Sequence, residues 1–313
     1  MELSIVTTLY NSASHLREFH RRAVLAAASV TADFEVIYVN DGSPDDSLEI
    51  ILEEHAKDPR VKVVDLSRNF GQHKAVMTGL GFSSGKLVFL LDSDLEEAPE
   101  ILKGMLEHLE KTKADAVYGL QQDRKGGIVR GMLGGLFYAL FSKITAYDIP
   151  RNSTMARLLT RRYVNALLEY RDKELYFDGV CAITGFHQVP YPVDKTWKKR
   201  TDYSLAKRVS MAVTAITSFS NKPLIFIFYL GCFVFGTAFV AASYLFSRQF
   251  LYGIYLEGWA SLTISIWMIG GLMLLCLGIL GIYLSRLFVE VKDRPLTTVR
   301  AVYDRSGKTN EKI

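Results

Sequence analysis

Residues 86–96 read KLVFLLDSDLE, an apolar run that leads directly into Asp92, Asp94 and Glu96. The apolar run is typical of a strand that is buried on both faces, as in a parallel sheet. Acidic side chains that follow such a strand lie at the carboxyl edge of the sheet, where open α/β sheets bind their ligands. Carboxylate oxygens in a tight turn suit Mg²⁺ or Mn²⁺ bridging to a diphosphate, so the stretch predicts a divalent-cation site.

Short β-rich runs alternate with helical patterns over the first 120 residues, which favours a parallel, doubly wound α/β sheet. The expected strands are Leu3–Leu9, Phe34–Asn40, Val61–Asp65, Lys86–Leu91 and Ala116–Gly119.

A second acidic turn, Asn40-Asp41-Gly42-Ser43, follows the second expected strand. Ser43 is a suitable helix cap, and Pro44 suits the first helical position, so we expect a helix to begin there. Asp41 then lies on the same edge as Asp92. Its alternative role is that of an Asx-turn residue, which is common for Asp before Gly.

Two long runs without a charged residue, 223–246 and 259–285, follow the soluble part. Each exceeds the ~20 residues that cross a bilayer core, so we expect a two-helix transmembrane hairpin. The loop 247–258 is then periplasmic, and the tail 286–313 is cytosolic together with domain 1–200. This orientation rests on the excess of Lys and Arg beside the outer ends of the two runs. Those residues are Lys198, Lys199, Arg200, Lys207, Arg208, Lys222, Arg286, Lys292, Arg294 and Arg300.

Two segments resemble helices that lie on a membrane surface. Residues 129–146 carry one apolar helix face between Arg130 and Lys143, which fits either an interfacial helix or a helix packed on the sheet. Residues 201–222 are expected to form a juxtamembrane helix. Gly270-Gly271 and Gly278–Gly281 would permit close helix packing, within one hairpin or in a homo-oligomer.

Composition excludes several classes. Among 313 residues, 49% are apolar and 22% charged, which rules out a disordered chain. The net charge of +4 and the lack of a basic, aromatic-interleaved tract argue against a nucleic-acid partner. Three distant cysteines offer no disulfide framework. No G-x-G-x-x-G loop follows the first strand, which excludes a nicotinamide-dependent dehydrogenase.

Several segments together resemble glycosyltransferase family 2, in particular its membrane-anchored polyprenyl-phosphate members related to dolichol-phosphate mannose synthase. They are Val6–Asn11, Asn40–Ser43, the run Ser67-Arg68-Asn69-Phe70-Gly71-Gln72-His73, Leu91–Glu96 and the closing Gly281-Ile282-Tyr283. Their order, their spacing and the trailing pair of apolar runs agree with that family over nearly the whole chain. The form N-x-G-Q-H looks especially like bacterial undecaprenyl-phosphate sugar transferases.

The resemblance implies a GT-A fold with a mostly parallel sheet, and it assigns site roles. Asp92 and Asp94 are the implied catalytic residues, and together with Glu96 they are the implied ligands of Mg²⁺ or Mn²⁺. The implied nucleotide-sugar-binding residues are Thr8, Leu9, Tyr10, Asn11, Asp41, Arg68, Gln72 and Ser93. For His73 a direct chemical role and a surface role both stay open, and Arg68 suits either a phosphate contact or an exposed salt bridge.

The chain departs from the family pattern at the acceptor site. Ser12 stands where an acidic residue is usual, and Gln121 or Gln122 stands where an arginine is usual. Arg124 and Arg130 remain as candidates for the acceptor phosphate, with membrane headgroups as their alternative partners. The stretch 151–157 lacks the aspartate of many relatives, so no carboxylate base is expected there. A lipid monophosphate needs none, because its second pKa near ~6 makes it a nucleophile at pH 7.

The expected function is inverting, metal-dependent transfer of a sugar from a nucleotide sugar, a UDP-sugar first, to undecaprenyl phosphate at the cytoplasmic face of the bacterial inner membrane. The product would serve modification of envelope glycans of the O-antigen or lipid A type. One alternative is a non-catalytic, nucleotide-binding membrane scaffold. A processive polysaccharide synthase is the other, but it lacks support because no Q-x-x-R-W segment is present.

Overall fold

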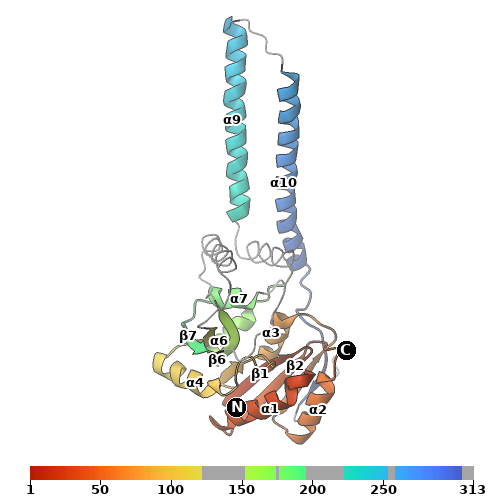
Figure 1. The fold of residues 1–313 in the computed structure, drawn as a ribbon, viewed down its shortest axis with the longest axis vertical. Helices are drawn as coiled ribbons and strands as arrows, with labels where there is room; N and C mark the ends of the chain where they lie inside the picture. Colours follow the sequence, from red (N-terminus) through yellow and green to blue (C-terminus); the bar gives the residue numbers. More distant parts are fainter. Residues whose placement is uncertain (122–151, 174–175, 195–221, 253–257, 305–313) are drawn as a thin grey trace. The chain divides into compact units, whose positions relative to one another are not determined.

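The structure is a computed structural model that describes residues 1–121, 152–173, 176–194, 222–252 and 258–304 (Figure 1). The expected interfacial helix at 129–146 lies outside the described residues, as does the juxtamembrane segment up to residue 221. The described residues form two compact units, one around a β-sheet and one made of two long helices.

The first unit is built on an eight-stranded sheet with the order β7-β5-β6-β4-β1-β2-β3-β8. The strands are β1 (Leu3–Leu9), β2 (Phe34–Asn40), β3 (Val61–Leu66), β4 (Leu87–Leu90), β5 (Ala116–Gln121), β6 (Ser153–Thr160), β7 (Gln188–Val193) and β8 (Val299–Tyr303). The central strands β4, β1, β2 and β3 are mutually parallel, whereas β6 and β8 run antiparallel to their neighbours. Because the central four run the same way, their carboxyl ends meet at one edge.

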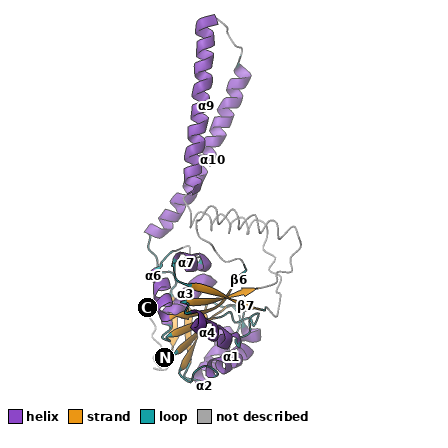
Figure 2. Ribbon diagram, turned by 90° about the vertical axis from the view of Figure 1, so that its left-hand side faces the viewer, coloured by secondary structure: helices purple, strands orange, loops and turns teal. Residues whose placement is uncertain are grey.

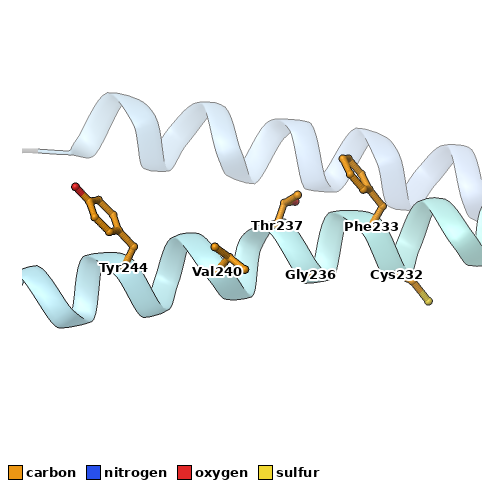
Figure 3. Close-up of a pocket in the computed structure, with 6 residues that line it drawn as sticks. All are labelled: Cys232, Phe233, Gly236, Thr237, Val240 and Tyr244. Atoms are coloured by element: carbon orange, nitrogen blue, oxygen red, sulfur yellow. The ribbon is translucent and has the colours of Figure 1, made fainter.

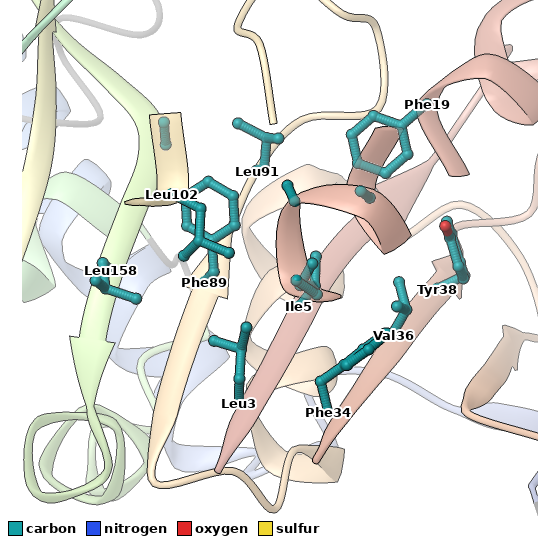
Figure 4. Close-up of a cluster of buried hydrophobic side chains, with 14 of the residues drawn as sticks. Leu3, Ile5, Phe19, Phe34, Val36, Tyr38, Phe89, Leu91, Leu102 and Leu158 are labelled. Carbon is teal, nitrogen blue, oxygen red and sulfur yellow. The ribbon is translucent and has the colours of Figure 1, made fainter. Parts of the chain in front are cut away.

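Helices cover both faces of this sheet (Figure 2). They are α1 (Ala13–Ala28), α2 (Ser47–Lys57), α3 (Gln72–Phe82), α4 (Ile101–Thr112), α6 (Arg161–Glu169) and α7 (Phe177–Ile183). One core joins α1, α2 and α4 to the sheet, with Phe19, Phe34 and Phe89 almost fully buried (Figure 4). A second core joins α3, α6 and α7 to the opposite face, around Val6 and Tyr163. Burial of each large apolar side chain contributes up to about 1.5–3 kcal/mol, which fixes the sheet as a rigid platform.

The expected strands agree closely with the observed ones, and the sheet is mixed with a mostly parallel centre. The expected helix start at Ser43 and Pro44 is wrong, because α2 begins at Ser47 with Asp46 as its N-cap residue. Asp45 explains the difference, since its carboxylate accepts hydrogen bonds from the hydroxyls of both Ser43 and Ser47 and holds residues 43–46 as a turn. The tail after residue 286 also contains a strand, β8, which pairs with β3.

The second unit contains α9 (Lys222–Tyr252) and α10 (Trp259–Val291), each of which ends beyond the last residue of the expected run. Among the described residues, Ser265–Val291 is the one segment long and apolar enough to cross a membrane, with a mean hydropathy of 2.2. A shorter apolar stretch, Leu224–Val234, lies in α9.

Candidate active site

The turns that follow β1, β2, β3 and β4 converge at the carboxyl edge of the parallel strands. Leu9 pairs with Asn40, and Asn40 with Asp65, so the ends of β1, β2 and β3 are level with one another. The Asp41 turn and the Asp92 turn are therefore brought to the same edge, as the sequence predicts. Open α/β sheets bind ligands in the crevice outside this edge.

Asp41 holds the turn that follows β3. Its two carboxylate oxygens accept hydrogen bonds from the backbone N–H groups of Phe70 at 2.7 Å and Gly71 at 3.0 Å. The residue is only 2% exposed, and burial raises its pKa above the ordinary aspartate value although these two hydrogen bonds act in the opposite direction. Because its carboxylate reaches a distant turn, Asp41 is not a local Asx-turn residue.

Gly42 lets the two turns approach each other. Its φ of +59° lies in the left-handed region, and a Cβ there would come within 2.5 Å of the backbone of Arg68 and Asn69. No other residue fits such a contact without moving one of the turns.

The start of α3 connects the two acidic turns. Gly71 donates its N–H to Asp41, and the adjacent Gln72 donates from Nε2 to Oδ1 of Asp92 at 2.7 Å. Two consecutive residues thus hold Asp41, which the sequence assigns to nucleotide-sugar binding, and Asp92, which it assigns to catalysis and the metal.

The remaining acidic residues of the turn differ in their surroundings. Asp94 is exposed, with one oxygen accepting from the backbone of Glu96 at 3.0 Å. Glu97 is 3% exposed and accepts from the backbone of Ala156 at 3.2 Å, which anchors the turn to β6. Glu97 is absent from the residues expected at the site, although a further acidic residue directly after the D-x-D turn was the signal that could have identified it.

The side-chain oxygens at this edge suit a hard cation only in part. No three His, Cys, Asp or Glu side chains converge on one point within the described residues. Mg²⁺ commonly takes one or two carboxylates and completes its shell with water and substrate phosphates, and this is the arrangement that the exposed Asp94 and the half-buried Asp92 can offer.

Ser93 joins the end of β4 to the end of β1. Its hydroxyl donates to the carbonyl oxygen of Thr8 at 3.0 Å and lies 3.0 Å from Oγ of Ser12. Ser93 and Ser12 are both buried, so their hydroxyls serve the internal network. Leu9 is also buried in the core, which leaves its backbone, whose carbonyl accepts from Asp41 N–H, as the part near the edge.

The turn after β1 exposes Tyr10, at 51%, and Asn11. The N–H of Asn11 donates to Oγ of Ser43 at 2.8 Å, and the N–H of Ala13 donates to Asp45 at 2.9 Å. Partial burial raises the pKa of Asp45, but hydrogen bonds from Ser43, Ser47 and Ala13 outweigh it and lower that pKa to about 2. An ionised Asp45 therefore ties the first two turns together and presents the Tyr10 ring at the rim.

Arg68 is exposed on the third turn. Its guanidinium donates to the carbonyl of Asn69 at 3.0 Å and lies 4.1 Å from the ring centroid of Phe70. These contacts are within its own turn and differ from the exposed salt bridge that was one of the two roles expected for it. The guanidinium therefore lies at the rim of the edge, held by its neighbours.

His73 contacts the segment before α7. Its Nδ1 accepts from the backbone N–H of Phe177 at 3.3 Å, and its ring centroid lies 5.9 Å from that of Tyr176. The first turn of α3 thereby links residues 176–179 to the Asp92 turn.

Arg157 is a buried cation that is absent from the expected site. It is 2% exposed on β6, forms an ion pair with Asp178 of α7, and lies 5.4 Å from the ring centroid of Phe177. Its place as the one charged residue of a strand was the signal that could have identified it. Because a buried charge requires a partner, the pair fixes α7 beside the carboxyl end of β4, whose Leu90 pairs with Arg157. Arg124 and Arg130, the expected acceptor ligands, lie outside the described residues.

A hollow of about 540 Å³ lies along α9 in the second unit, where Phe233, Thr237 and Tyr244 point toward the neighbouring helix (Figure 3). Cys232, Gly236 and Val240 complete its lining, and none of the six carries a charge. The hollow therefore offers no charged side chain to a ligand, and the candidate site is the carboxyl edge of the sheet.

Comparison with known proteins places this edge in context. Residues 4–168 match the family described as Glycosyl transferase family 2. A protein of Mycobacterium tuberculosis (strain CDC 1551 / Oshkosh) named "Putative glycosyltransferases" is 45% identical over 311 residues, which are 99% of this chain and 91% of the relative. The SfII prophage-derived bactoprenol glucosyl transferase of Shigella flexneri is 29% identical over 298 residues, covering 94% of this chain and 96% of that protein.

The fold is also similar to a solved structure, the mannosyltransferase PcManGT from Pyrobaculum calidifontis in complex with GDP-Man and Mn²⁺. The TM-score is 0.50 at 15% identity, over 93% of this chain and 86% of that one. At this identity the likeness concerns the fold.

Proposed function

Because the chain belongs to glycosyltransferase family 2, we propose that it is an inverting, metal-dependent enzyme that moves a sugar from a UDP-sugar to undecaprenyl phosphate. The observation that carries the proposal is the junction at the start of α3, where Gly71 and Gln72 fix Asp41 and Asp92 at one sheet edge. The relative named bactoprenol glucosyl transferase supports a polyprenyl-phosphate acceptor and makes glucose the first sugar to test.

The donor would lie across the turns that follow β1, β2, β3 and β4. Its base would stack on the exposed Tyr10 ring, beside the turn that Asp41 and Gly42 hold in place. Its diphosphate would face Asp92 and Asp94, with Glu96 within the same turn. A bound Mg²⁺ or Mn²⁺ would supply positive charge for the departing diphosphate. The backbone of Thr8–Asn11 and the side chain of Arg68 border this space, and Ser93 supports it from beneath.

The transfer step requires alignment rather than a proton acceptor. An oxygen of the lipid phosphate dianion forms a bond to the anomeric carbon, and the bond from that carbon to the nucleoside diphosphate breaks. The total negative charge is the same before and after, so no proton moves. Attack opposite the leaving group inverts the anomeric centre. The chain's task is to hold the two reactants in line, which can supply several kcal/mol of the barrier reduction, about 7–11 in well-oriented systems.

The acceptor would be held by the part of the chain that contains Arg124 and Arg130, and by the bilayer. We propose that α9 and α10 form the transmembrane hairpin, with the catalytic domain and both termini in the cytoplasm and the inner membrane as the location. Both helices exceed 30 residues, and large apolar side chains such as Trp267, Leu274 and Phe233 are more than 65% exposed. An apolar surface of this extent requires lipid or a partner.

The proposal is tested by transfer of radiolabelled sugar from UDP-glucose, other UDP-sugars and GDP-mannose to undecaprenyl phosphate in detergent. We expect labelled lipid from one donor, lost when EDTA replaces Mg²⁺ or Mn²⁺. Asp94→Asn should lower kcat by about a hundredfold, because it removes a carboxylate that would hold the metal ion whose charge acts on the leaving diphosphate. Asp46→Asn, at an exposed aspartate that precedes α2, is the matched control and should leave the rate unchanged.

The product's anomeric configuration, read by NMR, tests inversion separately, and retention would replace this mechanism by one with a covalent intermediate. Binding of nucleotide without transfer from any donor would favour the non-catalytic scaffold instead. Full activity of Asp94→Asn would remove the metal turn from the mechanism.

A further inference from the structure

The strand β8 follows the apolar helix α10 after only seven residues, 292–298, and returns to the catalytic sheet. It pairs antiparallel with β3, the strand that leads into the Arg68–Gly71 turn. Just before β8, the carbonyl of Thr298 accepts from the N–H of Ser67 at 2.9 Å, and the hydroxyl of Thr297 lies 2.7 Å from that of Thr78 in α3.

Arg300 of this strand holds the end of β3 from two sides. Its Nη2 donates to the carbonyl of Ser67 at 2.7 Å, and its Nη1 lies 3.3 Å from Oδ2 of Asp65. Asp65 is 2% exposed, whereas the Arg300 side chain is 58% exposed. The arginine therefore covers a buried carboxylate from the outside.

Asp65 connects Arg300 to the turns after β2 and β1 through hydrogen bonds. Its Oδ1 accepts from Nδ2 of Asn40 at 2.8 Å, and Oδ1 of Asn40 accepts from the N–H of Ser43 at 3.2 Å. Ser43 in turn accepts from the N–H of Asn11. An unbroken series of hydrogen bonds thus runs from Arg300 to the turns after β2 and β1, while Ser67 leads directly into the turn that Asp41 holds.

We propose that Arg300 is a positioning residue for donor binding, and that β8 therefore completes the nucleotide site of the catalytic domain. The inference rests on the proposed function for its ligand, a nucleoside diphosphate sugar. Arg300 itself need not touch that ligand. It fixes Asp65 and Ser67, and through them the turns after β1, β2 and β3, which border the space for the nucleotide.

The test compares Arg300→Ala with Arg300→Lys and with a matched variant elsewhere in the sheet. Arg162 is exposed and pairs with the less exposed Asp115 at 2.5 Å, directly before β5 and thus at the opposite edge. Arg300→Ala should raise the KM for the donor by about tenfold, the size expected when a charge-assisted hydrogen bond is lost. The KM for undecaprenyl phosphate and kcat at saturating donor should change less than about twofold. Arg300→Lys should recover part of the loss, and Arg162→Ala should behave as the unchanged chain.

A second readout needs no ligand. Hydrogen exchange of a peptide covering residues 66–72, which contains the amides that bind Asp41, should be faster in Arg300→Ala and unchanged in Arg162→Ala. If Arg300→Ala does not fold, the donor KM and the hydrogen exchange are measured on Thr297→Val and Arg300→Lys instead. Unchanged exchange and donor KM, or equal rises in the KM for donor and acceptor, would overturn the inference. Failure of the unchanged chain to bind UDP with Mn²⁺ would instead contradict the proposed function, and the exchange measurement would still decide the role of Arg300.

Discussion

His20 is a buried histidine whose protonation opposes folding. It is 9% exposed, and its Nδ1 lies 2.9 Å from the hydroxyl of Tyr38. Burial lowers its pKa, although Glu54 and Asp58 nearby act to raise it. Since the unfolded chain binds this proton near pH 6.5 and the folded chain does so only at lower pH, stability is complete above about pH 6.5 and falls below it.

We therefore expect the melting temperature of the detergent-solubilised chain to fall between pH 7.5 and pH 5.5, because protonation of His20 favours the unfolded chain. His20→Gln should reduce that pH dependence, because the glutamine does not titrate. His15→Gln, at an exposed histidine of the same helix, should retain it. An equal fall in melting temperature for all three chains would exclude His20 as the cause.

At the scale of single residues, the sequence identified the acidic residues but not what holds them. Asp41 and Asp92 follow strands with a plain apolar pattern, so their place at the carboxyl edge could be predicted. Their partners could not, because Phe70, Gly71 and Gln72 lie 20 or more positions away and contact them only through the fold. The pairs Arg157–Asp178 and Arg300–Asp65 join strands to segments with no pattern that relates them.

Among elements, the turns after β2 and β3 depend on each other through Gly42. Gly42→Ala combines a left-handed backbone with a Cβ 2.5 Å from the backbone of Arg68 and Asn69. Gly185 has a similar φ of +69° but no atom within 4 Å of the added Cβ, so Gly185→Ala carries the backbone strain alone.

We expect Gly185→Ala to cost about 1 kcal/mol of stability and Gly42→Ala clearly more, with a raised donor KM only for Gly42→Ala. Thermal unfolding and the donor KM, measured on both variants, separate the two effects. Equal loss of stability in both variants, with the donor KM unchanged, would show that the close approach of the turns after β2 and β3 is not required for donor binding.

The elements that the sequence predicted are those with local signals. β1 and β2 are rich in apolar and β-branched residues and match their expected bounds. The edge strands β7 and β8 are short and only partly buried, and β7 contains two prolines, so neither shows the apolar pattern of a central strand. β6 mixes Ser, Thr and Arg with apolar residues, and a strand that runs antiparallel among parallel ones has no signature in sequence.

For the molecule as a whole, the membrane topology is the prediction that rests most on sequence. Lys and Arg flank the outer ends of α9 and α10, while the inner ends offer only Arg248, in the last turns of α9, and Glu257, in the connection between the helices. Because moving positive flanks across the membrane is costly, we propose that they stay in the cytoplasm. Among the described residues, Ser265–Val291 is the segment that meets the length and hydropathy requirement for a span. If it were the single span, the two ends of α10 would lie on opposite sides of the membrane, and α9 would not cross it.

Single cysteines decide between these two arrangements. With Cys181, Cys232 and Cys276 replaced by alanine, Glu257→Cys should react with a membrane-impermeant maleimide from the periplasmic side of intact cells. Ser306→Cys should react only after the membrane is opened. Ser14→Cys, at an exposed position of α1, reports the side of the catalytic domain.

The hairpin requires positions 14 and 306 to react from the same side and position 257 from the other. Reaction of 14 and 257 from one side, with 306 on the other, would establish a single span. The strand β8 could then not pair with β3, because the sheet that contains both strands lies in one compartment. The pairing of β8 with β3 therefore favours an even number of crossings between residues 66 and 299, which the hairpin satisfies and the single span does not.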